Sequence, residues 1–429
     1  MIFLAGLAIL VGAIVVGIPI GFALGLSGIL SLMLVVNWTV IQALMAQVVH
    51  EAAANFVILT IPMFILMAEF LSAGGIARDL MIAWNKAMRG LRGGLAVAAV
   101  VTGVILAATS GSSTASVASI TRAAFPTMRA FGYNPGFAIG LISITGTLAI
   151  LIPPSIALVV FGLMTSEPIG DLFIAGLLPG LLTAGGYILT VALVARFRPD
   201  YIPAVKSVTE IKELSDKVGG PVWPIVLLVV LVLGGLYGGV ATPSEIGAIG
   251  ALGAGVIALA LGRMTWFYFV QSVGNALRSS AMIITIIFSA SLFGYFITFS
   301  HVTDSILDWI AEAGLSPYAV LTLLILIYLV LGMVMDQFAI LVLTAPITHA
   351  IVTGLGFDGV WFGIIMVKTA EIGLVTPPLG LNVFIGSSTG GVPPREAFRG
   401  VVPFIVAELV ILAILIVFPG VVTWLPTVM

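Results

Sequence analysis

The chain contains no cysteine and little charge, and each absence excludes a class of function. With no Cys among 429 residues, disulfides, thiolate metal sites and cysteine nucleophiles are ruled out. The histidines His50, His301 and His349 are scattered, so no transition-metal cluster is expected. Charged residues make up 8% of the chain, against about a quarter in soluble domains. With a net charge of -2 and no basic cluster, we expect no nucleic-acid partner.

The chain is rich in apolar residues. Hydrophobic residues account for 61% of the sequence, so we expect a lipid bilayer rather than water around the protein. The opening MIFLAGLAIL is apolar without a basic region before it. We therefore expect this segment to be a retained span and not a cleaved signal peptide.

The apolar runs predict an all-α polytopic protein. A helical span needs about 20 apolar residues, and residues 1–36 are long enough for two spans, broken near Gly17 and Pro19. Together with the other runs this gives about ten spans. The other runs are 55–74, 136–163, 172–195, 222–239, 244–262, 279–300, 359–386 and 400–427.

In two further apolar stretches, the distance between the central polar residues and the flanking charges is too short for the chain to cross the bilayer. From Ser112, at the centre of the stretch 92–122, roughly ten residues lead to Arg122, which is about 15 Å or half the hydrocarbon thickness. We therefore predict a re-entrant hairpin with its tip at residues 110–113. By the same reasoning, 317–354 forms a second hairpin with its tip at residues 335–337.

The positive-inside rule fixes an orientation for this arrangement. All but Lys368 of the 16 lysines and arginines fall on one face, which is then cytoplasmic: Arg78, Lys86, Arg89, Arg92, Arg122, Arg129, Arg196, Arg198, Lys206, Lys212, Lys217, Arg263, Arg278, Arg395 and Arg399. The opposite loops carry acidic residues: Glu51, Glu167, Asp171, Glu245, Asp304, Asp308, Glu312 and Asp358. Both termini are therefore expected outside the cytoplasm. The runs at Arg78–Arg92 and Asp304–Glu312 are expected to lie along the interface as short amphipathic helices.

An internal repeat joins these features. Residues 224 positions apart match, as Thr145 matches Thr369, and Pro153-Pro154 matches Pro377-Pro378. At the same offset Ser112 corresponds to Asp336, so the two hairpin tips occupy equivalent positions in the repeat. One hairpin enters from each side, so the halves 1–196 and 222–429 are inverted repeats joined by a polar linker at 197–221. This is the architecture of secondary transporters, which bind substrate and ion near the midplane.

The hairpin tips supply the first candidate site residues. Unpaired polar groups at the midplane cost several kcal/mol each, so the hydroxyls of ATSGSSTAS need helix partners or a bound ion. Small residues also allow simple helix packing. Because two half-helices end at the tip, we favour ion or substrate coordination by Ser110, Gly111, Ser112 and Ser113. Asp336, with Gln337, is the corresponding candidate in the second tip, as an ion ligand or a coupling group.

Consecutive prolines break the spans beside both tips. Each removes a backbone donor and frees a carbonyl one turn earlier. We predict two cages of oxygens suited to sodium, one at Pro153, Pro154 and Ser155, and one formed by Thr376, Pro377, Pro378, Gly380 and Asn382. Lys368 and Glu371 lie one turn apart within a span, and we expect them to pair with each other. With Thr147 they are secondary candidates.

These residues together resemble the large membrane subunit, the DctM/SiaM type, of tripartite ATP-independent periplasmic (TRAP) transporters. The likeness runs through IPMFILMAEFLSAGGIARDL (61–80), ATSGSSTASVASI, MRAFGYNPGFAIG, ILIPPSIALVVFG, LFIAGLLPGLL and TPPLGLNVFIG. It implies an elevator mechanism in the bacterial inner membrane, driven by sodium as the coupling ion without an organic cofactor. It also implies a small four-helix membrane subunit and a soluble periplasmic binding protein that delivers the substrate.

Carried onto this chain, the resemblance implies two sodium sites. The first draws on Ser110, Ser112 and Ser113 with carbonyls near Pro153 and Ser155. The second draws on Asp336 and Gln337 with Thr376, Gly380 and Asn382. The substrate, a sialic acid, dicarboxylate, keto acid or similar small organic acid, would lie between the tips. The ATSGSSTAS spelling departs from the more Ala-rich family sequence, which leaves the individual ligands open.

Two rival functions remain. A stand-alone sodium-coupled carboxylate symporter or antiporter would need no binding protein. An intramembrane serine protease would use Ser112 with His349 as its base. His349 falls near the outer interface, well past the second tip, so geometry disfavours this contact.

Overall fold

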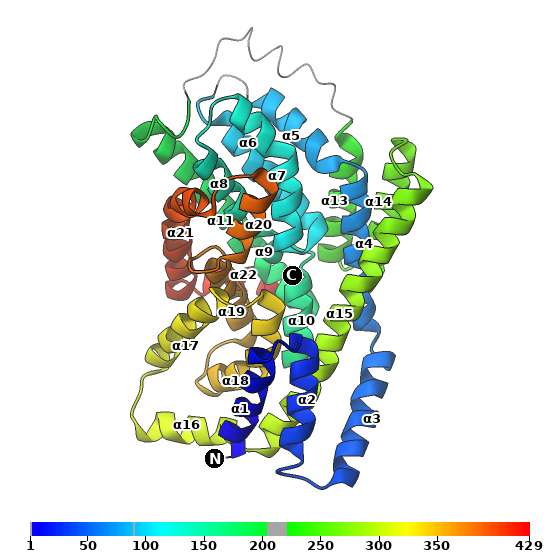
Figure 1. The fold of residues 1–429 in the computed structure, drawn as a ribbon, viewed down its shortest axis with the longest axis vertical. Helices are drawn as coiled ribbons and strands as arrows, with labels where there is room; N and C mark the ends of the chain where they lie inside the picture. Colours follow the sequence, from blue (N-terminus) through cyan, green and yellow to red (C-terminus); the bar gives the residue numbers. More distant parts are fainter. Residues whose placement is uncertain (1, 89–90, 204–220) are drawn as a thin grey trace.

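The computed structural model describes residues 2–88, 91–203 and 221–429, and every regular element within these ranges is a helix. This confirms the all-α expectation. Figure 1 shows an elongated molecule in which many helices run roughly along the long axis. The expected cytoplasmic positions of Arg89, Lys206, Lys212 and Lys217, and most of the 197–221 linker, lie outside the described residues.

The first half begins with α1 (Ile2–Val15) and α2 (Ile20–Leu32), separated at the expected break. The chain then forms α3 (Trp38–Ala54), η1 (Phe56–Leu59), α4 (Thr60–Ala73) and α5 (Ile76–Ala87). The first hairpin is α6 (Gly94–Ser110) and α7 (Ser113–Ala130). The broken span is α8 (Pro135–Gly146), α9 (Leu148–Leu151) and α10 (Ile156–Thr165), and α11 (Ile169–Phe197) closes the half.

The second half also contains a hairpin followed by a broken span. It begins with α13 (Trp223–Tyr237), α14 (Pro243–Ala260), α15 (Trp266–Phe299) and α16 (Val302–Glu312). The second hairpin is α17 (Pro317–Gly332) and α18 (Gln337–Gly354), followed by the broken span α19 (Gly359–Leu374) and α20 (Leu381–Gly390). The half ends with α21 (Pro394–Val417) and α22 (Gly420–Val428).

The number of spans differs from the expected ten. In the described residues, six helices are long and apolar enough to cross a membrane, or up to seven if the bent pair formed by α8–α9 and α10 counts as one span. The helices α1, α2 and α13 are apolar but shorter. The run 400–427 is not one helix, because Pro419 disfavours helical geometry at Phe418 and separates α21 from α22. The sequence reading also missed α3.

The internal repeat is visible in the helix boundaries. The bounds 113–130 of α7 and 337–354 of α18 are 224 positions apart at both ends. The N-caps Asn134 of α8 and Asp358 of α19 keep the same offset, and each accepts a hydrogen bond from the backbone three residues on. Figure 1 shows the α6–α7 hairpin in the upper half and the α17–α18 hairpin in the lower half. The two hairpins therefore enter from opposite ends.

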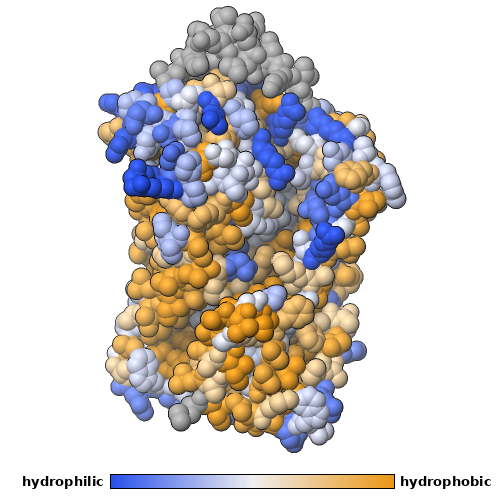
Figure 2. Space-filling view, viewed as in Figure 1, coloured by the Kyte–Doolittle hydropathy of each residue, from blue (hydrophilic) through white to orange (hydrophobic). Residues whose placement is uncertain are grey.

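The two ends differ in charge. Figure 2 shows hydrophilic residues gathered toward both ends and an apolar belt between them. The helix α5, with Arg78 and Lys86, lies at the upper end in Figure 1, and we call this the basic end. The helix α16, with Asp304 and Asp308, lies at the lower or acidic end. Both helices are amphipathic, as expected.

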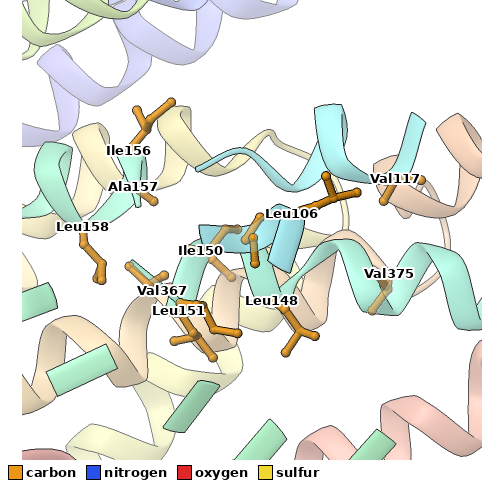
Figure 3. Close-up of a cluster of buried hydrophobic side chains, with 14 of the residues drawn as sticks. Leu106, Val117, Leu148, Ile150, Leu151, Ile156, Ala157, Leu158, Val367 and Val375 are labelled. Carbon is orange, nitrogen blue, oxygen red and sulfur yellow. The ribbon is translucent and has the colours of Figure 1, made fainter. Parts of the chain in front are cut away.

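The first broken span lies in the core. Figure 3 shows Leu148, Ile150 and Leu151 before the break and Ile156, Ala157 and Leu158 after it. Leu106 of α6, Val117 of α7 and Val367 of α19 share the same apolar cluster. Residues of both hairpin arms and both broken spans therefore enclose the break, and this packing positions the site.

Candidate functional site

The first hairpin tip lies directly against the first break. Gly111 ends α6 in the left-handed region, at φ 58°. Its carbonyl accepts a hydrogen bond from the Ile156 backbone N–H at 3.4 Å. A Cβ added at Gly111 would stand 3.1 Å from the Pro154 carbonyl oxygen. The predicted meeting of tip and break therefore exists in the structure.

The serines of this tip have different partners. Ser110 Oγ pairs with Ser116 Oγ at 2.6 Å, and Ser112 Oγ lies 3.2 Å from Thr114 Oγ1. Ser113 instead leaves its hairpin and donates to Glu371 Oε1 of α19 at 3.2 Å. In the break, Pro153 and Pro154 are buried and joined by a cis bond. Ser155 caps α10 by accepting the Leu158 N–H at 3.3 Å.

The second tip is more open. Asp336 caps α18 and accepts hydrogen bonds from the N–H groups of Phe338 and Ala339, at 3.0 and 3.2 Å. Gln337 is buried, and its Nε2 finds no hydrogen-bond partner among the described residues. Just before this tip, Gly332 touches Gly373 of α19 so closely that a Cβ on Gly332 would lie 2.8 Å from Gly373 Cα. This tip thus stands next to the second break.

The second break combines exposed prolines with buried polar groups. Pro377 and Pro378 are exposed and joined by a cis bond, and Gly380 takes φ 54° before α20. Thr376 Oγ1 donates to the Ile372 carbonyl at 2.5 Å. Asn382 is fully buried and donates to Glu371 Oε2 at 3.4 Å. In the described part of the chain, no hydrogen bond joins Asp336 or Gln337 to this break.

Glu371 connects the first hairpin to the second broken span. Its carboxylate is 3% exposed and accepts from Ser113 of α7 and Asn382 of α20. Both donors are neutral, and the Oδ1 of Asn382 finds no hydrogen-bond partner within the described ranges. A carboxylate without a cation is costly in such a place. This corner of the site therefore favours a positive ligand.

The expected pairing of Lys368 with Glu371 is wrong. Lys368 forms an ion pair with Glu408 of α21 and donates to Thr183 Oγ1 of α11 at 3.0 Å. A side chain on a helix can turn to either neighbouring helix, so one-turn spacing on α19 did not decide the partner. Lys368 and Glu408 are both buried, so this is a buried ion pair.

Sequence reasoning missed Glu408 and Tyr187. Tyr187 of α11 donates to Glu408, and its hydroxyl lies 2.9 Å from the secondary candidate Thr147. Glu408 could have been recognised from the sequence, because an acidic residue in the middle of an apolar span is by default a candidate functional residue. For Tyr187 there was no such signal, since a buried tyrosine is common in membrane helices.

One cavity brings the two halves together. It has a volume of about 420 Å³. The first tip lines it with Ser110 and Ser112, α10 with Ile156, α18 with Phe338 and α20 with Ile385. Glu69 of α4 and Ser279 of α15 also line it. Both hairpins and both broken spans thus face one cavity of a size suited to a small ligand.

The proposed Ser112–His349 protease pair is absent. His349 Nε2 is bonded to Glu167 Oε1 at 2.7 Å, while Ser112 Oγ lies beside Thr114. The two candidate protease residues are thus engaged elsewhere, which removes the geometric basis for a nucleophile and base.

Comparison with known proteins identifies the family. The model for "Tripartite ATP-independent periplasmic transporter, DctM component" matches residues 7–421. The chain belongs to this DctM family. It is 38% identical to the "C4-dicarboxylate TRAP transporter large permease protein DctM" of Pseudomonas aeruginosa, over 94% of this chain and 93% of that protein. This confirms the resemblance inferred from sequence, and the DctM chain is a transporter component rather than an enzyme.

Two further matches extend the comparison. The DctM chain is 32% identical to the "Isethionate TRAP transporter permease protein DctMQ" of Oleidesulfovibrio alaskensis, over 95% of this chain and 64% of that protein. Its fold resembles the YdaH transporter of Alcanivorax borkumensis, described as having an unusual topology, with a TM-score of 0.65. That match covers 88% of this chain and 87% of the other at 14% identity, so it speaks for the fold alone.

Proposed function

We propose that this DctM chain takes up a small organic acid into the cell, coupled to sodium, in the bacterial inner membrane. The observation that carries the proposal is the cavity of about 420 Å³ that residues of both hairpins and both broken spans line. The Pseudomonas relative is named for C4-dicarboxylates and the Oleidesulfovibrio relative for isethionate. Small organic anions are therefore the substrate class we assign.

Sodium coupling is supported by the oxygen-rich surroundings of the tips. The backbone carbonyl of Pro154, the hydroxyl of Ser113 and the carboxylate of Glu371 offer hard oxygen ligands of the kind that sodium prefers. A sodium ion near Glu371 would neutralise a carboxylate that otherwise has only neutral donors. We propose the first sodium site around Ser110, Ser112, Ser113 and the first break, and the second around Asp336, Gln337 and the second break.

The remaining elements of the proposal follow from the family. We propose that a soluble periplasmic binding protein delivers the acid and that a small membrane subunit completes the transporter. The relative named DctMQ supports the second partner. The hairpins and broken spans would move as one body past α4 and α15 in an elevator motion, with the basic end in the cytoplasm.

The test begins with the binding protein, whose ligand is measured by calorimetry. Uptake of that ligand is then measured in proteoliposomes that hold the chain with its membrane partner, with and without an inward sodium gradient. We expect uptake only with sodium and binding protein, and strong losses for Ser112→Ala and Asp336→Ala. Thr427→Ala, at an exposed position near the end of α22, serves as the control. Uptake without the binding protein would favour a stand-alone symporter, and sodium-independent uptake would refute the coupling.

A further inference from the structure

A row of cavities leads from the first tip to the basic end. The 420 Å³ cavity shares Ser110, Ala115 and Glu69 with a second cavity of about 270 Å³. That cavity in turn shares Arg78, Arg122 and Glu69 with a third of about 780 Å³. Because neighbouring cavities share these lining residues, the three lie next to one another between the tip and the basic end.

The α7 wall of this path becomes more basic with distance from the tip. Ser116, Ser119 and Arg122 recur every three residues, so they lie along one face of α7. Among the described residues that line the tip cavity, Glu69 is the ionisable one, and it accepts a hydrogen bond from Asn275 Nδ2 at 3.2 Å. In the next cavity, Arg78 and Arg122 join Glu69 and add two positive charges. The attraction for an anion is therefore stronger in this second cavity than at the tip.

The arginines differ in how far they are already neutralised. Arg263 forms an ion pair with Asp79 at 2.5 Å, so its charge is matched within the cavity. Arg122 donates only its Nε, to its own helix at Ala118. Among the described residues, neither Arg122 nor Arg78 has an acidic partner. Two guanidinium groups are therefore free to bind an anion, and guanidinium binds carboxylate or sulfonate oxygens with two parallel hydrogen bonds.

The positive-inside rule accounts for the end at which Arg78 and Arg122 lie, but not for the cavity that they share. Arg122 lies in the middle of α7 rather than in a loop, and it lines a cavity that Ser110 of the tip also lines. The second half has no counterpart, because the positions 224 further on hold Pro346 and Val302. The basic wall is thus specific to the path toward the basic end.

We infer that Arg122 and Arg78, with Ser119, form an exit site that receives the acidic group of the substrate as it leaves the first tip. The inference rests on the proposed uptake of organic acids and adds a binding step on the release side. The serine face of α7 offers hydroxyl donors on the way, and the arginines hold the anion before it enters the solvent.

The test uses the absence of native cysteine. Ser119→Cys gives a single thiol in the path. The full chain is placed in phosphatidylcholine nanodiscs, and its modification rates by an anionic and a cationic methanethiosulfonate reagent are compared. We expect the anionic-to-cationic rate ratio to fall about fivefold with Arg122→Gln, because one nearby charge is lost. Arg129→Gln, on the same helix but outside the cavities, should change it less than twofold.

Three results would overturn the inference. They are no reaction at Ser119→Cys with either reagent, a ratio unaffected by Arg122→Gln, or an equal change with Arg129→Gln, which would indicate only general surface potential. A fourth result would also contradict the inference. If the preference for the anionic reagent is lost when phosphatidylglycerol is included, the arginines bind lipid headgroups instead. None of these measurements needs a transported substrate, so failure here and failure of sodium-driven uptake can be told apart.

Discussion

At the scale of single residues, the buried charges of α19 and α21 do not balance. Lys368 is matched by Glu408, whereas among the described residues Glu371 receives hydrogen bonds only from Ser113 and Asn382. Counting both carboxylates as ionised leaves one negative charge in excess in a medium of low dielectric. The excess lies between a hairpin tip and a broken span, where a coupling cation would relieve it.

Replacing Glu371 by Gln tests this imbalance. The amide keeps an oxygen for Ser113, so we expect little loss of thermal stability. Without the negative charge, the sodium concentration for half-maximal uptake should rise about tenfold, equivalent to ~1.4 kcal/mol. The measurement is uptake against sodium concentration in proteoliposomes. An unchanged sodium requirement in a folded Glu371→Gln protein would show that Glu371 takes no part in coupling.

Lys368 should matter for stability instead. Lys368→Met leaves Glu408 buried with Tyr187 as its donor but without a cation, which costs about 3–5 kcal/mol. We expect a clear fall in the unfolding temperature in detergent. Combining Lys368→Met with Glu408→Gln should restore most of it, because no charge then remains unpaired. Arg129→Met, at an exposed position, is the control. If the single and double variants unfold alike, the ion pair is not the cause.

The partners of these charges show where sequence reasoning stops. Lys368 and Glu371 could be recognised as intramembrane charges from the sequence alone. Their partners could not, because Thr183, Glu408 and Ser113 come from helices whose rotation about their axes is set by packing. Ionisable residues in a span therefore mark a site without giving its connections.

At the scale of elements, both hairpins could be predicted because charge and length constrain them strongly. The tips at 110–113 and 335–337 agree with the ends of α6–α7 and α17–α18. The helix α3 was missed because Gln42, Gln47, His50 and Glu51 interrupt its apolar run. The helix α3 has apolar residues on one face and polar residues on the other. A search for 20 consecutive apolar residues does not detect such an amphipathic helix.

Substitution of Gly111 tests whether the first hairpin tip must contact the first break. Gly111→Ala places a Cβ 3.1 Å from the Pro154 oxygen and 3.2 Å from the Ile156 nitrogen, and also forces a left-handed conformation on alanine. Gly132→Ala forces a similar conformation at φ 83° with no atom within 4 Å, so it isolates the conformational cost of about 1–2 kcal/mol. We expect Gly111→Ala to be the less stable of the two and to lose transport, measured by thermal unfolding and uptake. If Gly111→Ala and Gly132→Ala change stability and uptake equally, the contact between the tip and the break is not required.

At the scale of the whole molecule, the inverted repeat makes orientation decisive. In the inverted repeat proposed from the sequence, the two halves run in opposite directions, so the fold alone does not say which end faces the cytoplasm. The difference in charge between the two ends supports one orientation. Arg78, Lys86 and Arg129 belong to the basic end, and α16 with its aspartates to the acidic end. On the positive-inside rule, we propose that the basic end faces the cytoplasm.

This orientation can be measured directly in the cysteine-free chain. Single cysteines at Arg92, Arg129 and Asp308 are treated with an impermeant maleimide in right-side-out and inside-out membrane vesicles. We expect Arg92→Cys and Arg129→Cys to react only in inside-out vesicles, since α6 and α7 return to the side they left, and Asp308→Cys only in right-side-out ones. Reaction of Arg92→Cys and Arg129→Cys from opposite sides would mean that α6 and α7 cross the bilayer. The cavity between the tips would then lose its place at the midplane, and with it the physical basis for transport.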